Sequence, residues 1–88
     1  MAESKKDGAK VGAMIRNVAR KQVSDATPPE AKRTYDRLRR LGYSDAEAIE
    51  FIASALATEM FEIMKYKREH DKERYEEALR ALPSLPSE

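Results

Sequence analysis

The sequence predicts an all-α protein, a small four-helix bundle whose neighbouring helices run antiparallel, up and down. Apolar side chains recur at helical spacing in four segments, and only short connections separate them. The third segment stands apart because no Lys or Arg occurs from residue 43 to 63, although these two types make up 17 of the 88 residues. An acidic helix that is apolar on more than one side is expected at the centre of a bundle. The third helix, at about 44–65, is therefore predicted to be central.

Length and composition indicate a single domain. We expect a disordered tail over residues 1–7, one helical domain over 8–82 and a Pro-containing tail over 83–88. The chain has no Cys, which excludes disulfides and thiolate sites, and no run approaches the ~20 apolar residues of a membrane span. A cytoplasmic location is the expectation that fits these features.

The first two helices are basic. The first runs from about residue 8 to 23, and an apolar stripe on it is expected to face the core. The members of this stripe are Val11, Met14, Ile15, Val18 and Gln22. The second helix is predicted to begin at Thr27-Pro28-Pro29-Glu30, where Thr27 supplies the N-cap hydroxyl and Glu30 reaches back to complete a capping box. Gly42 is predicted to end it in a left-handed conformation.

The third helix starts with a second capping box, formed by Ser44 and Glu47. Its main stripe is expected to enter the core and consists of Ile49, Ile52, Ala53, Leu56, Met60, Ile63 and Met64. Glu59 borders this stripe and is expected to pair with an arginine of the second helix. Asp71 is predicted to cap the last helix, which Pro83 ends.

A net charge of +1 hides strong segregation along the chain. Residues 1–41 carry 11 basic and 5 acidic side chains, residues 42–64 carry five acids and no base, and residues 65–88 carry six of each. Helices of opposite charge attract one another when they pack side by side. The structural interpretation is therefore that the basic flanks of the first two helices meet the acids of the third. The functional interpretation is a positive face for an anionic partner.

A second apolar stripe on the third helix predicts the function. It lies broadly opposite the main stripe, and no other segment is an obvious cover for it. The candidate protein interface that it forms consists of Phe51, Ala55, Thr58 and Phe61. The sequence thus predicts a non-enzymatic protein-protein interaction or assembly module. A second copy or another protein would bind at this stripe or across an apolar surface of the first and third helices. Neither a cofactor nor a small-molecule substrate is expected.

The alternative is a nucleic-acid-associated protein that uses the basic face of the first two helices. The candidate anionic-partner residues are Arg16, Arg20, Lys32, Arg33, Arg37 and Arg40. The turn at Gly42-Tyr43 also invites comparison with helix-turn-helix proteins and with ubiquitin-associated domains. The five acids of the helix after this turn would repel phosphate, which argues against the former. The first helix has no aromatic residue on its apolar face, which argues against membrane anchoring.

Enzymatic chemistry is not predicted. Glu59 and Glu62 have the spacing used by di-metal carboxylate bundles, but such sites add histidines from the same faces. The only histidine, His70, falls in a predicted linker beside Asp71. No nucleophile-base set and no glycine-rich phosphate loop is present in the sequence, so neither a catalytic residue nor a metal site is expected.

Several short motifs are spread from about Val11 to Leu82. They are Gln22, Pro28-Pro29-Glu30, Arg37-Leu38, Gly42-Tyr43, Ile52-Ala53-Ser54, and Asp71 with Glu73-Arg74-Tyr75. In these residues the chain resembles a family of uncharacterised bacterial all-helical domains, a domain-of-unknown-function family. The resemblance implies the four-helix fold and a metal-binding set of histidine pairs on the first and third helices. The positions that correspond to these histidines are Gly12, Arg16, Ala46 and Glu50, so this chain lacks the implied site.

Overall fold

The structure is a computed structural model that describes residues 2–67 and 69–84, with side chains from Lys10 onward. It contains four helices: α1 (Ala2–Asp25), α2 (Pro29–Arg40), α3 (Asp45–Tyr66) and α4 (Lys72–Ala81). No strand occurs in the described part of the chain. The predicted all-α, four-helix architecture is confirmed. Residues 85–88 of the predicted C-terminal tail lie outside the described residues.

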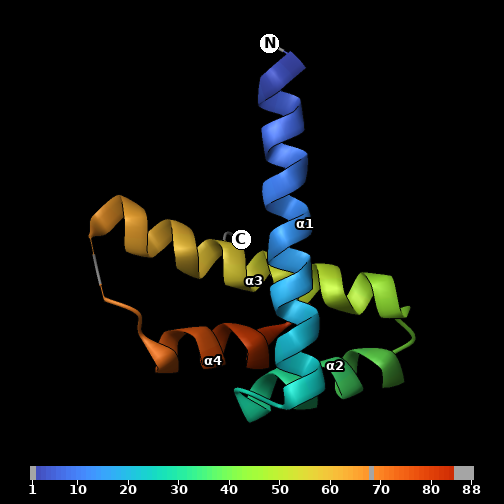
Figure 1. The fold of residues 1–88 in the computed structure, drawn as a ribbon. Helices are drawn as coiled ribbons and strands as arrows, with labels where there is room; N and C mark the ends of the chain where they lie inside the picture. The colour runs from blue at the N-terminus through green and yellow to red at the C-terminus, as the bar shows by residue number, and fades with distance from the viewer. Residues whose placement is uncertain (1, 68, 85–88) are drawn as a thin grey trace.

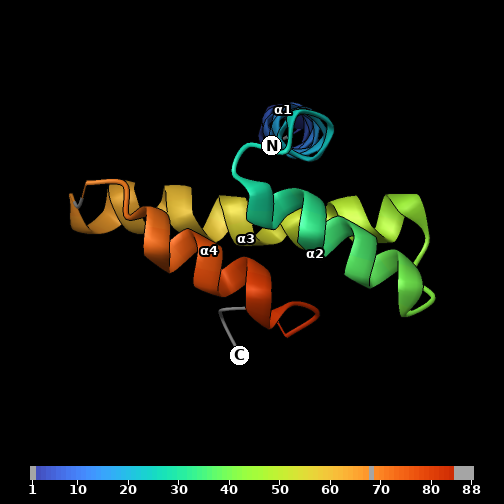
Figure 2. The same ribbon diagram turned by 90° about the horizontal axis from the view of Figure 1, so that it is seen from below.

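Each of the other three helices packs against α3, as expected for a central helix, and α2 likewise packs against the other three. Helices α2 and α4 run antiparallel to α3, with α2 beside its N-terminal half and α4 beside its C-terminal half (Figure 1). Helix α1 lies on a different side of α3 and crosses it steeply, so that Figure 2 shows α1 almost end-on. The up-down order therefore describes α2, α3 and α4, while α1 lies across them. None of these helices is long and apolar enough, within the described residues, to cross a membrane.

Three of the predicted helix ends are confirmed. The Ser44 hydroxyl accepts a hydrogen bond from the Glu47 N–H, and the Ser44 N–H donates to the Glu47 carboxylate at 2.8 Å, which completes the capping box. The Asp71 carboxylate caps α4 by accepting from the Arg74 N–H. Gly42 follows α2 with φ +102°, a conformation that a side chain would strain. These short-range motifs fix where α2 stops and where α3 and α4 start.

Two other predictions about helix ends are wrong. Helix α2 begins without a side-chain cap, because its N-cap residue is Pro28. The Thr27 hydroxyl instead donates to the Asp25 carbonyl, and Glu30 binds Arg33 at 2.7 Å, so the predicted capping box is absent. Residues 2–7, predicted to be a disordered tail, are helical. They contain Ala, Glu and Lys without a helix breaker, and each residue added to an existing helix gains a hydrogen bond.

The core is built from a few large aliphatic side chains and many alanines. Leu38, Ile49, Ile52 and Leu79 are fully buried or nearly so. The buried alanines are Ala19, Ala31, Ala48, Ala53 and Ala55. The buried hydroxyl of Thr34 donates to the Leu79 carbonyl at 3.2 Å, so it is not left unpaired in this core. The small side chains let the helix backbones approach closely.

Glu59 is the only buried carboxylate among the described residues, and it ties α3 to α4. Its two oxygens accept from the Arg74 guanidinium at 2.8 and 2.9 Å, and one oxygen also accepts from the Asp71 N–H at 3.1 Å. The ring nitrogen Nδ1 of His70 lies 3.2 Å from the same carboxylate. The partner of Glu59 is therefore Arg74 of α4 and not, as predicted, an arginine of α2. Burial alone would raise the pKa of Glu59, but these hydrogen bonds outweigh it and hold the pKa below its usual value.

We expect Glu59→Gln to lower the free energy of unfolding by about 1–3 kcal/mol at neutral pH, because charge-assisted hydrogen bonds are lost. The folded-state pKa of Glu59 is depressed, so its stabilising effect is present above the unfolded-state pKa of about 4.3 and is lost as the pH falls through the folded value. Urea denaturation should show the difference from wild type shrinking below about pH 4. Glu77→Gln, at an exposed position of α4, is the control. A difference that does not change on acidification would contradict this assignment.

Candidate functional site

The six residues of the predicted anionic-partner face are mostly engaged within the chain. Arg16 and Arg20 of α1 bind acids of α3, with Arg16 3.1 Å from Glu50 and Arg20 2.9 Å from Asp45. On α2, Lys32 binds Asp36 and Arg33 binds Glu30. Arg40 makes no ion pair within the described residues. The bases do not converge on one free surface. The α1–α3 pairs agree with the structural interpretation of the segregated charge for the first helix, whereas Lys32 and Arg33 of α2 pair with acids of their own helix.

Arg37, the remaining member of this set, has a structural position that the sequence did not indicate. Its guanidinium donates to three backbone carbonyls at the C-terminal end of α4, those of Leu79 (2.9 Å), Arg80 (3.2 Å) and Leu82 (2.9 Å). The last carbonyls of a helix lack intrahelical partners and carry its partial negative charge. Arg37 of α2 therefore caps α4 and joins the two helices.

Asp45 joins α1, α2 and α3 at the start of α3. It accepts hydrogen bonds from Arg20 and from the Tyr35 hydroxyl, which lies 2.7 Å away. These two hydrogen bonds hold the pKa of Asp45 below its usual value. Together with the helix cap at Ser44, they commit the acids at this end of α3 to structural contacts.

The positions at which the family resemblance implies histidines meet where α1 crosses α3. Gly12 and Arg16 of α1 lie in the same depression as Glu50 of α3, and Arg16 and Glu50 form the ion pair described above. Ala46, the fourth position, precedes Glu50 by one helical turn. With one carboxylate among them, these residues form an ion pair and not a metal-ligand set. The part of the chain with described side chains contains no group of three or more His, Cys, Asp or Glu residues that could hold a metal ion.

The candidate interface of Phe51, Ala55, Thr58 and Phe61 is divided by the fold. Ala55 is buried in the core, so it is not available to a partner. Phe51 is half-buried against Tyr43, with the two rings in an edge-to-face contact at 5.0 Å. Thr58 is also half-buried, and its hydroxyl donates to the Ser54 carbonyl. Phe61 is 57% exposed, and the Lys65 ammonium lies 5.2 Å from its ring centre. The predicted stripe is thus partly covered at Phe51 and Thr58, buried at Ala55 and most exposed at Phe61.

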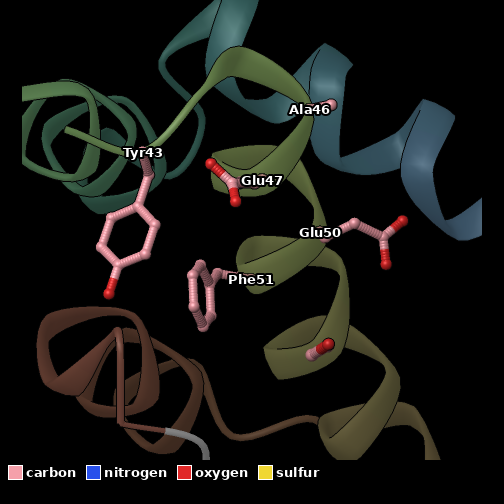
Figure 3. A pocket seen from close by; sticks show the side chains of 6 residues that line it. Tyr43, Ala46, Glu47, Glu50 and Phe51 are labelled. Carbon is pink, nitrogen blue, oxygen red and sulfur yellow. The ribbon is translucent and has the colours of Figure 1, made fainter.

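An open depression of about 340 Å³ lies beside Phe51 (Figure 3). Figure 3 shows the Tyr43 and Phe51 rings next to each other, whereas the Glu50 carboxylate points away from them. The two carboxylates on its border are already bound, Glu47 in the capping box and Glu50 to Arg16. The depression therefore presents an aromatic pair beside two carboxylates that are already engaged.

Further exposed apolar side chains lie on α1 and on the part of α3 that follows its crossing with α1. We call this set the apolar step and define it as Val11, Met14 and Val18 of α1 with Met60 and Met64 of α3. These side chains are between 42% and 77% exposed. Exposed apolar patches of several hundred Å² on a small protein are often functional.

The two walls of the apolar step face the same open space. On α1, Arg16 and Arg20 point to the N-terminal half of α3, whereas Gln22 accepts a hydrogen bond from Tyr75 of α4, on the other side. Val18 and Val11 precede Gln22 by four and eleven residues, which places them on the Gln22 side of α1. On α3, Ala53 and Ala57 line the contact with α1, and Met60 and Met64 continue their stripe beyond it. The step therefore consists of exposed apolar side chains on two helices that meet at an angle.

Sequence periodicity had assigned these five residues to the core, and that prediction is wrong for all of them. The stripes themselves exist, but α1 packs against the core through Ile15, Ala19 and Val23 and leaves Val11, Met14 and Val18 exposed. Three of the five residues are methionines, which is the one signal in the sequence that could have suggested an adaptable surface.

Comparisons with known proteins add no relative: no protein-family model, no curated protein and no solved structure matches this chain.

We expect Arg37→Met to destabilise the fold by about 1–3 kcal/mol, because three carbonyls at the end of α4 lose a charged donor. Arg40→Met removes an exposed arginine of the same helix that has no ion pair within the described residues, and should change stability by less than about 0.5 kcal/mol. Thermal or urea unfolding of the two variants measures the contrast. Equal stability of both would show that Arg37 is not a cap.

Proposed function

We propose that the protein is a non-enzymatic protein-interaction module that binds its partner through the apolar step. The observation that carries this proposal is the exposure of five large apolar side chains on two helices that meet at an angle. Burying a Val or Met side chain contributes about 1.5–3 kcal/mol, so the step offers substantial binding energy. Scattered single apolar residues would not support the same proposal, because they are normal on protein surfaces.

The N-terminal half of α1 gives further support. Figure 1 shows this half extending away from the other three helices. An isolated helix of this length is marginal in water and normally needs packing on one face. Val11 and Met14 provide such a face, and a bound partner would cover it.

The engaged polar groups favour a binding role over catalysis or nucleic-acid binding. The carboxylates of Asp45, Glu47, Glu50 and Glu59 all take part in caps or ion pairs. Five of the six bases proposed for an anionic partner are likewise bound within the chain. Phosphate binding would have to displace these contacts, whereas the apolar step is free among the described residues.

The experiment compares wild type with the double variant Met14→Gln, Met64→Gln and with Leu41→Gln as a matched control. Leu41 is also an exposed apolar residue but lies at the end of α2, away from the step. Light scattering after size exclusion reports self-association, and quantitative capture from extract of the producing cells reports other partners. The double variant should bind about 30- to 700-fold more weakly than wild type, because each of the two lost contacts is worth about 1–2 kcal/mol. The Leu41→Gln control should bind like wild type.

Both variants should unfold within about 0.5 kcal/mol of wild type, because the substituted side chains are exposed. Loss of binding together with loss of the fold would not count as support. If the double variant keeps the self-association and the partners of wild type, the step is not the interaction surface.

A further inference from the structure

We infer that the apolar step takes an amphipathic helix of another protein, one whose apolar stripe is flanked by acidic residues. This inference rests on the proposed function and names the chemistry of the partner. Its three supports are the shape of the step, its methionines and the charge along its borders.

The shape fits a rod more closely than a flat surface. Helix α1 stands across α3, so the step has one wall from each helix (Figures 1 and 2). A helix is about 10–12 Å wide with its side chains and packs at an axial distance of about 8–10 Å. Placed alongside α1, such a helix contacts Val11 and Val18 on one wall and Met60 and Met64 on the other.

The methionines suit a helical partner. Met14, Met60 and Met64 supply three of the five side chains of the step. Methionine is unbranched and polarizable, and surfaces rich in it accept the apolar faces of helices with different sequences. Val11, Met14 and Val18 are spaced three and four residues apart, which is the spacing of a helix-helix seam.

The borders of the step carry an excess of lysines. Lys10 and Lys21 flank the stripe of α1, and Lys65 and Lys67 flank and follow Met64. Of these four, Lys21 has a carboxylate partner, Asp25 at 3.3 Å, and Lys65 lies over the Phe61 and Tyr66 rings. The acids of the adjoining part of α3 are elsewhere: Glu59 is buried against Arg74, and Glu62 lies on the side of the helix away from Met60. The electrostatic complement of this border is acidic.

The same charges disfavour a second copy as the occupant. If two α1 helices paired antiparallel with Val11 opposite Val18, like flanks would meet. The Lys10 and Lys21 side of one copy would then lie against the same side of the other. An acidic flank on a different protein removes this repulsion and replaces it with attraction.

The test uses two synthetic 18-residue peptides that share one leucine stripe and differ only in flanks of Glu or of Lys. Fluorescence polarization with the full chain measures their affinities at low and at high salt. We expect the Glu-flanked peptide to bind at least tenfold more tightly than the Lys-flanked peptide, with a preference that weakens as salt is added. The variant Lys10→Glu, Lys67→Glu should lower the affinity for the Glu-flanked peptide about tenfold and raise that for the other peptide. The control Arg40→Glu reverses a charge at the end of α2 and should change the affinity for either peptide much less.

Each other outcome overturns the inference in a recognisable way. If both peptides bind with equal affinity and the double variant Met14→Gln, Met64→Gln weakens their binding, the inference of an acidic partner is wrong. The proposed function then still holds. Binding of neither peptide, while capture by wild type still depends on the step, removes the helical partner. A dimer that the methionine variant abolishes identifies a second copy as the occupant. Tighter binding to vesicles of equal parts phosphatidylglycerol and phosphatidylcholine than to either peptide identifies a membrane surface. If the methionine double variant changes neither peptide binding nor partner capture, the proposed function itself is wrong.

Discussion

The steep crossing of α1 over α3 is the constraint on which the rest of the surface depends. Small and mid-sized residues meet at the crossing, with Ala19 buried on α1 and Ala53 and Ala57 lining the contact on α3. Two helices that cross steeply share only a short contact, however long their apolar stripes are. The apolar stripe of α1 therefore loses contact with α3 in the N-terminal half of α1. The apolar stripe of α3 loses contact with α1 in the C-terminal half of α3. The apolar step is the space between these two departing stripes.

Charge holds this crossing in place from one side only. Arg16 and Arg20 reach the acids at the N-terminal half of α3, and Asp45 also accepts from Tyr35 of α2. Each exposed ion pair contributes little by itself, about 0–1 kcal/mol. Their joint effect is orientation, because they place the charged flank of α1 over the N-terminal half of α3. The apolar flank must then face the C-terminal half, where α3 has no exposed acid beside Met60 and Met64.

The parts of the fold that sequence reasoning predicted are those that local chemistry determines. Ser44, Asp71 and Gly42 act within a few residues of their own positions, and their motifs were read correctly. The partner of Glu59 and the cap formed by Arg37 depend on contacts over 15 and more than 40 residues, so spacing could not identify them. Periodicity assigned Val11 and Met60 to apolar stripes but carries no information on the crossing angle. Periodicity also could not show that the turn at Tyr43 packs against Phe51. This contact partly covers one end of the candidate interface and leaves Phe61 as its exposed end.

The lysine borders explain how a small protein tolerates an open apolar junction. Lys10, Lys21 and Lys67 lie along its borders, and their like charge would oppose two copies that bury their steps against each other. Beyond the crossing, Val11 and Met14 of α1 are exposed, whereas Ile15 and Ala19 pack against the core. A helical partner seated in the step supplies this missing contact to Val11 and Met14, so that binding and the stability of the N-terminal half of α1 are coupled. The extension of α1 beyond its crossing with α3 thus leaves Val11 and Met14 exposed and also gives the step its second wall.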